Sequence, residues 1–205
     1  MASTPSTLTD EHRELAIDAS VLINLLGTGE AEAVLLALAR PIIIASEVYR
    51  EVKRDPFTGT DATGIVSALE TRGLVTRFDL DAEGTAHMLD LVSAPGSDAL
   101  DDGEAATIAL GARRRCCVVI DEMRGRRIAN GVPIEAGVLG TLDILACRSV
   151  QKALGETRFH AAILSAARAA RMRFPVEYGA WVETLLGEDE ARSLPGLRAY
   201  YRTRR

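Results

Sequence analysis

The stretch Leu15-Ala16-Ile17-Asp18 decides the fold, because it places an acid directly after a short apolar run. Ser20 is a plausible N-cap for a helix, and the apolar residues between Val21 and Leu26 follow at helical spacing. This order predicts a buried strand, then an acidic turn, then a helix.

Two further segments repeat the order. Ile42-Ile43-Ile44 is a β-branched run typical of a strand buried on both faces, and Ser46-Glu47-Val48 opens the next helix. Residues 116–120 form another expected strand, which ends at Asp121. Because helical patterns separate these strands, the chain is expected to build a parallel sheet of the α/β class.

The domain organisation follows from the same pattern. Residues 14–155 are expected to form the domain that contains this parallel sheet. Residues 1–13 carry Ser, Thr, Pro and charge without periodicity, which predicts a disordered leader. From Glu156 the pattern is purely helical, so residues 156–205 are expected to be a C-terminal helical extension and not a second core.

Acidic residues follow the expected strands of this sequence. In such a sheet, ligands bind outside the carboxyl ends of the strands, which is where these acids are expected to lie. A single acid at the start of a helix has an ordinary explanation, since it offsets the helix dipole by about 0.3–1 kcal/mol. Several acids at one edge repel one another and raise one another's pKa unless a cation lies between them. The pattern predicts a site for Mg²⁺ or Mn²⁺, with these candidate ligands: Asp18, Glu47, Asp102, Glu104 and Asp121.

The net charge of −5 provides no bulk positive field, so any contact with nucleic acid must be local. The cluster Arg124, Arg126 and Arg127 lies next to Asp121 and is the best candidate for binding RNA phosphates. The other arginine clusters are expected to be solvated or paired with acids.

Ordered blocks of the sequence resemble those of PIN-domain nucleases. The block at residues 137–142, Gly-Val-Leu-Gly-Thr-Leu, matches one that follows the acidic blocks in a bacterial and archaeal branch of that family. The acidic blocks themselves are Ile17-Asp18-Ala19-Ser20-Val21-Leu22-Ile23, Ala45-Ser46-Glu47-Val48, Leu100-Asp101-Asp102-Gly103-Glu104-Ala105 and Val119-Ile120-Asp121 with the following Gly125-Arg126-Arg127-Ile128-Ala129.

The resemblance implies a three-layer α/β/α sandwich around a central, mainly parallel sheet. It also implies a divalent-metal-dependent endoribonuclease that hydrolyses phosphodiester bonds, often the toxin half of a toxin–antitoxin pair. Carried over by position, it gives catalytic and metal-binding roles to Asp18, Glu47, Glu104 and Asp121, and Ser20 takes the small polar position beside the first acid. Asp102 is close enough in sequence to help bind metal. The implied partners are RNA, a small antitoxin protein and a second copy of the chain in a homodimer.

Asp143 departs from the pattern, because members of this branch usually carry Gly after Gly-Thr-Leu. We expect it on the exposed polar face of a helix. Two alternatives are that it joins the acidic pocket or pairs with an arginine.

Other readings stay open at this point. The chain could be a non-catalytic PIN-like protein that binds metal or a partner, or an RNA-processing nuclease without an antitoxin. A signalling receiver is disfavoured, since it needs adjacent acids after the first strand and a late lysine, whereas Lys152 lies deep in a helical pattern. The longest apolar run, residues 33–39, is far shorter than the roughly 20 residues that cross a bilayer, so we expect a cytoplasmic protein with no membrane segment.

Overall fold

The computed structural model describes residues 6–134 and 137–204. Its centre is a five-stranded sheet with the strand order β3-β2-β1-β4-β5, and every neighbouring pair is parallel. The strands are β1 (Leu15–Ile17), β2 (Ile42–Ala45), β3 (Thr76–Phe78), β4 (Cys117–Val119) and β5 (Val138–Leu139). The predicted α/β/α sandwich with a parallel sheet is confirmed.

The strand order contains one reversal. From β1 the chain moves outward through β2 to β3, and then crosses back so that β4 pairs with the free side of β1. Leu15 therefore pairs with Ile42 on one side and with Cys117 on the other. Ligands bind in open α/β sheets outside the carboxyl ends of the strands at such a reversal, which here lies between β1 and β4.

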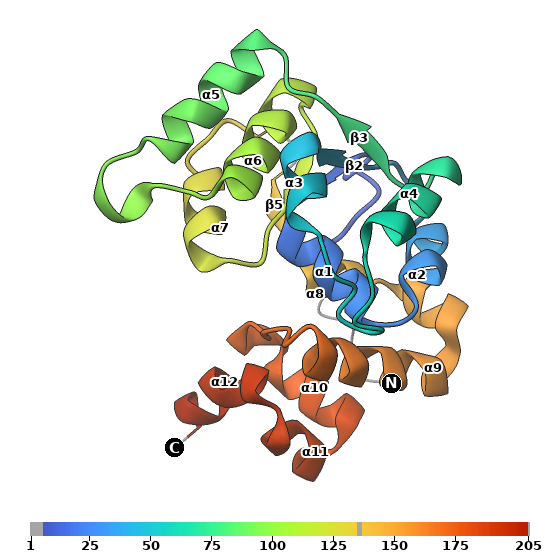
Figure 1. The fold of residues 1–205 in the computed structure, drawn as a ribbon. Helices are drawn as coiled ribbons and strands as arrows, with labels where there is room; N and C mark the ends of the chain where they lie inside the picture. The colour runs from blue at the N-terminus through green and yellow to red at the C-terminus, as the bar shows by residue number, and fades with distance from the viewer. Residues whose placement is uncertain (1–5, 135–136, 205) are drawn as a thin grey trace.

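Helices cover both faces of the sheet (Figure 1). On one side lie α5, α6 and α7, and on the other lie α1, α2, α8 and α9, with α10, α11 and α12 beyond α9. The bounds are α1 (Ala19–Gly27), α2 (Ala31–Leu38), α3 (Ser46–Glu51), α4 (Thr63–Thr71), α5 (Ala82–Val92), α6 (Asp102–Arg114), α7 (Met123–Ala129), α8 (Thr141–Leu145), α9 (Arg148–Ala169), α10 (Gly179–Leu186), α11 (Glu188–Ser193) and α12 (Arg198–Thr203).

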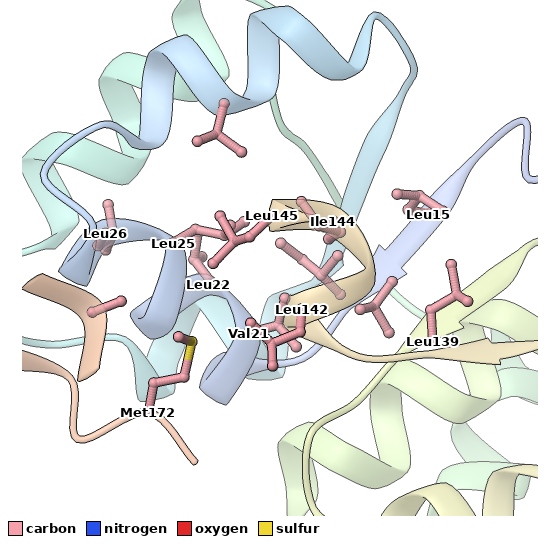
Figure 2. Close-up of a cluster of buried hydrophobic side chains, with 14 of the residues drawn as sticks. Leu15, Val21, Leu22, Leu25, Leu26, Leu139, Leu142, Ile144, Leu145 and Met172 are labelled. Carbon is pink, nitrogen blue, oxygen red and sulfur yellow. The ribbon is translucent and has the colours of Figure 1, made fainter. Parts of the chain in front are cut away.

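The strands are buried because both faces are covered, as their apolar runs predict. Figure 2 shows part of the core, in which Leu22 and Leu25 of α1 meet Leu142 and Leu145 of α8. This packing sets α8 directly beside α1. The two helices that follow Asp18 and Gly140 are thereby held against each other.

The structure corrects three local predictions. Asp18, and not Ser20, is the N-cap of α1, since its carboxylate accepts a hydrogen bond from the Val21 N–H. The sequence pattern predicts one helix over residues 139–154, whereas the structure divides this stretch into the end of β5, the short α8 and the start of α9. The pattern also predicts an extended piece at residues 132–136, but the strand β5 lies later, at Val138–Leu139, and residues 135 and 136 are outside the described part.

The two ends of the chain contact the body of the protein. Of the expected leader, residues 1–5 lie outside the described residues, whereas Ser6 and Thr7 donate hydrogen bonds to Asp143. The buried side chains of the C-terminal helices, including Phe159 and Val182, belong to the same hydrophobic cluster as the strands.

Within the described ranges, no single helix is long and apolar enough to cross a membrane, and α1 with α2 reaches that length only as a pair bent by 114°.

The packing of α6 on β4 gives a first prediction. A Cβ added at the buried Gly111 of α6 would overlap a methyl group of Val118, so Gly111→Ala should destabilise the fold by about 1–3 kcal/mol. Gly64 of α4 is the matched control, because a Cβ there meets nothing within 4 Å. Urea unfolding should show a lower midpoint for Gly111→Ala and no loss for Gly64→Ala, and equal midpoints would contradict the close packing.

Candidate active site

Asp18 stands at the carboxyl end of β1, at the reversal in strand order. Its side chain is only 2% exposed, and its backbone N–H donates to the Val119 carbonyl of β4 at 3.2 Å. The carboxylate accepts hydrogen bonds from the Val21 N–H at 2.7 Å and from the Ser20 hydroxyl, which contacts its two oxygens at 2.9 and 3.0 Å. Ser20 therefore orients Asp18 and does not face the site on its own.

Asp121 follows β4 and is held by two residues from other elements. The Thr141 N–H donates to Oδ1 at 2.8 Å, and the Thr141 hydroxyl donates to Oδ2 at 2.6 Å. The Asn24 amide of α1 donates to the same Oδ2 at 2.7 Å. Neither Asn24 nor Thr141 was assigned a role from the sequence, although Asn24 is the one polar residue between Val21 and Leu26.

Glu104 lies in the first turn of α6, which is capped by Asp101. Its side chain is 3% exposed; Oε2 lies 3.4 Å from Arg124 Nη2, and the buried Oε1 has no hydrogen-bond partner among the described residues. Glu47, in the first turn of α3, accepts from Arg50 at 2.9 Å through Oε1, and its buried Oε2 also lacks a partner in the described part of the chain. Two predicted ligands thus each keep one unpaired carboxylate oxygen.

Glycines allow the backbone to approach these acids closely. A Cβ at Gly125 of α7 would lie 2.6 Å from Glu104 Oε1, and one at Gly140 would lie 3.1 Å from Asp121 Oδ1. A Cβ at Gly103 would lie 2.5 Å from Glu51 Oε2. A side chain at any of these three positions would overlap sterically with a nearby carboxylate.

Burial without a compensating cation raises the pKa values of the inner acids. The pKa of Asp18 is raised to about 8, mainly by desolvation and further by the charges of Asp121 and Glu104. The hydrogen bonds from Val21 and Ser20 oppose this shift. Desolvation and the charges of Asp101 and Glu122 raise the pKa of Glu104 to about 7. Burial also raises the pKa of Asp121, despite its hydrogen bonds from Thr141 and Asn24. The site is therefore one in which negative charge is poorly stabilised.

Glu47 and Asp102 belong to a pocket that none of these three acids lines. Both line a surface pocket of about 310 Å³ together with Arg50, Glu51 and Lys53. The pKa of Glu51 is raised, first by partial burial and then by the charges of Asp101, Asp102 and Glu47. A hydrogen bond from the Gly103 N–H opposes this shift. Since Asp102 and Glu104 flank Gly103, the first turn of α6 joins the pocket to the inner acids. Glu51 is a neighbour that the sequence did not single out.

The donor set fits a hard divalent cation. All the candidate ligands are carboxylates, and two of their oxygens are buried and unpaired. In the part of the chain that the structure describes, however, no three acidic, histidine or cysteine side chains are close enough together to hold an ion as they stand. Binding a cation would require side-chain rotation.

The three candidate RNA-binding arginines differ in their contacts. Arg127 pairs with Asp98 at 2.6 Å, and Arg124 lies against Glu104. Arg126 is half-buried beside Gly140, lowers the pKa of Asp121 through its charge, and makes no ion pair within the described residues. It is the member of the cluster without an acidic partner in a salt bridge among the described residues.

The expectation for Asp143 and both of its alternatives are wrong. The side chain is neither exposed nor in the acidic pocket, and its partners are not arginines: it is 4% exposed and accepts hydrogen bonds from Thr7, Tyr178 and Gly140. Burial would raise its pKa, but these hydrogen bonds outweigh burial and hold the pKa below its usual value. Position on a predicted helix could not reveal partners that lie so far away in sequence.

The raised pKa of Asp18 predicts a pH-dependent stability. Between the unfolded pKa of 3.8 and the folded pKa of about 8, the folded state binds more protons, so the free energy of unfolding should fall as pH rises through this window. Asp18→Asn keeps a good N-cap and removes the buried charge. In EDTA, the variant should be more stable than the wild type at pH 8 by about 0.5–2 kcal/mol, with the difference vanishing near pH 4.

Thermal unfolding at both pH values measures this effect. Asp189→Asn, at an exposed position of α11, is the control and should change neither curve. A variant less stable than the wild type at pH 8 would show that the charge of Asp18 is compensated in the folded state.

Comparison with known proteins identifies the family. A family model described as a PIN domain (DUF3368) matches residues 14–182, which is most of the chain and extends through α9 into α10. No curated protein and no solved structure gave a match. PIN domains are typically nucleases, which supports a hydrolase acting on nucleic acid. The chain belongs to the PIN-domain family.

Proposed function

We propose that this protein is a divalent-metal-dependent endoribonuclease that hydrolyses phosphodiester bonds of RNA. The observation that carries the proposal is the group of buried, poorly compensated carboxylates of Asp18, Glu104 and Asp121 at the reversal between β1 and β4. Such a group has little structural purpose, because buried like charges destabilise a fold. It is well suited to attract a cation.

In this proposal, the ion-holding residues are Asp18, Glu47, Asp102, Glu104 and Asp121. A bound Mg²⁺ or Mn²⁺ supplies Lewis-acid chemistry and lowers the pKa of a water toward 7, so no side-chain nucleophile is needed. The remaining residues orient these ligands: Ser20 fixes Asp18, while Asn24 and Thr141 fix Asp121. Arg126 is available to bind a phosphate of the RNA next to Asp121.

The proposal extends to a biological role as the toxin of a toxin–antitoxin pair, acting as a homodimer and restrained by a small antitoxin protein. The support is the order of the sequence blocks, which resembles the branch in which such toxins occur. A small neighbouring reading frame with a DNA-binding pattern would support this role. Without such a neighbour, an RNA-processing nuclease is the better description.

Cleavage of single-stranded RNA is the central prediction. Purified protein should cut RNA in Mg²⁺ or Mn²⁺ and stop in excess EDTA. Asp18→Asn and Asp121→Asn should each reduce the rate by more than the roughly 10–100-fold that loss of an outer-shell partner costs. Asp189→Asn should cut like the wild type. Denaturing gels of labelled RNA measure all four rates.

Two results would contradict the proposal. Equal product from the wild type and both site variants would identify a contaminating nuclease. Mn²⁺ binding by calorimetry without any cleavage would favour the alternative of a non-catalytic PIN-like protein that binds metal.

A separate prediction concerns RNA binding by Arg126. The test uses an Asp18→Asn background, which blocks cleavage. In it, Arg126→Gln should weaken binding about equally for different RNA sequences. The slope of the logarithm of the binding constant against the logarithm of salt concentration should fall by about one, which corresponds to the loss of one phosphate contact. Arg127→Gln is the matched control, because Arg127 is already paired with Asp98. Fluorescence anisotropy over a range of salt concentrations measures both variants, and equal salt slopes would remove Arg126 from the RNA contact.

A further inference from the structure

Asp143 is a buried carboxylate whose two oxygens are well supplied with donors. Oδ1 accepts from the Thr7 N–H at 3.1 Å, the Thr7 hydroxyl at 2.6 Å and the Tyr178 hydroxyl at 2.6 Å. Oδ2 accepts from the Gly140 N–H at 2.9 Å. The backbone carbonyl of Asp143 also accepts from the Ser6 hydroxyl at 2.6 Å.

These donors come from three parts of the chain. Ser6 and Thr7 belong to the N-terminal segment, and Tyr178 immediately precedes α10 in the C-terminal helices. Gly140 lies in the turn between β5 and α8. The side chain of Asp143 therefore connects the N-terminal segment and the C-terminal helices to that turn.

The same turn holds Asp121. Consecutive backbone N–H groups point to different carboxylates: that of Gly140 donates to Asp143, and that of Thr141 donates to Asp121 at 2.8 Å. The Thr141 hydroxyl donates to the second oxygen of Asp121. Because the peptide between the two residues is planar and stiff, a shift of Gly140 is transmitted to both groups of Thr141 that donate to Asp121.

The turn has little room to adjust by itself. A Cβ at Gly140 would lie 2.8 Å from Arg126 Nη1 and 3.1 Å from Asp121 Oδ1, so the backbone of Gly140 already packs against the site. Catalytic geometry tolerates displacements of only about 0.5 Å. The residues that locate this turn therefore affect the orientation of Asp121.

We propose that Asp143 is a positioning residue for Asp121, and that Thr7 and Tyr178 act on the active site through it. The N-terminal segment and the C-terminal helices are then parts of the scaffold of the site. The catalytic consequence rests on the proposed function, whereas the effect on the turn does not.

The test removes single hydroxyl groups at a distance from Asp121. Tyr178→Phe and Thr7→Val each take one donor from Asp143 and leave every acid in place. The direct readout is the Thr141 amide, followed by its ¹H–¹⁵N chemical shift and its hydrogen exchange. We expect a shifted resonance and exchange about 10-fold faster in each variant.

Two further measurements connect the turn to function. Mn²⁺ affinity by calorimetry should fall about 10-fold, and kcat should fall about 10-fold with little change in KM, because the RNA contacts are untouched. In an Asp143→Asn background, Tyr178→Phe should add much less than it does alone, since the two residues act through one contact.

The control variants are Tyr201→Phe and Thr184→Val. Both remove a hydroxyl hydrogen bond from the C-terminal helices, to Glu183 and to the Ala180 carbonyl respectively, without touching Asp143. They should leave the Thr141 amide, the Mn²⁺ affinity and kcat unchanged.

The outcomes separate this inference from the proposed function. If Tyr178→Phe and Thr7→Val lower the melting temperature but leave the Thr141 amide unchanged, Asp143 serves stability alone and the inference is overturned. If the Thr141 amide responds as expected and the wild type cuts no RNA, the positioning role stands and the nuclease proposal fails.

Discussion

The parallel pairing of β1 with β4 is the constraint on which the site depends. Leu15 to Ile17 are hydrogen-bonded in register with Cys117 to Val119, so the residues that follow the two strands emerge side by side. Asp18 and Asp121 are separated by about half the chain in sequence and are brought together by this register alone. The crossover from β3 back to β4 also delivers α6, whose first turn adds Glu104. The grouping of these acids at one edge of the sheet therefore follows from one reversal in strand order.

Two kinds of buried acid coexist in the protein, and the contrast between them is informative. Asp143 and Glu104 are almost equally buried, at 4% and 3% exposure, yet their pKa values move in opposite directions. Asp143 has four hydrogen bonds to its carboxylate, whereas Glu104 has one long contact with Arg124 and an unpaired oxygen. Between these two residues, the supply of hydrogen-bond donors and not the depth of burial decides the direction of the pKa shift.

Much of this arrangement could be predicted from the sequence. The apolar runs ending at Asp18 and Asp121 indicated strands, and the alternation with helices indicated a parallel sheet, because both signals are local. Asn24, Thr141 and the partners of Asp143 could not be found in this way. Their contacts span 97 residues for Asn24 and Asp121 and 136 for Thr7 and Asp143, so they depend on how helices pack and not on the pattern within any one of them. Asp143 was misjudged for the same reason: a polar residue on a helix is expected to face water unless its distant partners are known.

The junction of Thr7, Asp143 and Tyr178 also bears on the order of assembly during synthesis. Thr7 is synthesised before Asp143 and Tyr178 is synthesised after it, so the junction lacks one of its members until Tyr178 has left the ribosome. A truncated chain that ends before Tyr178 contains all the acids of the site but lacks one of the donors that complete the junction. The junction can therefore form only after all the acids of the site have been synthesised.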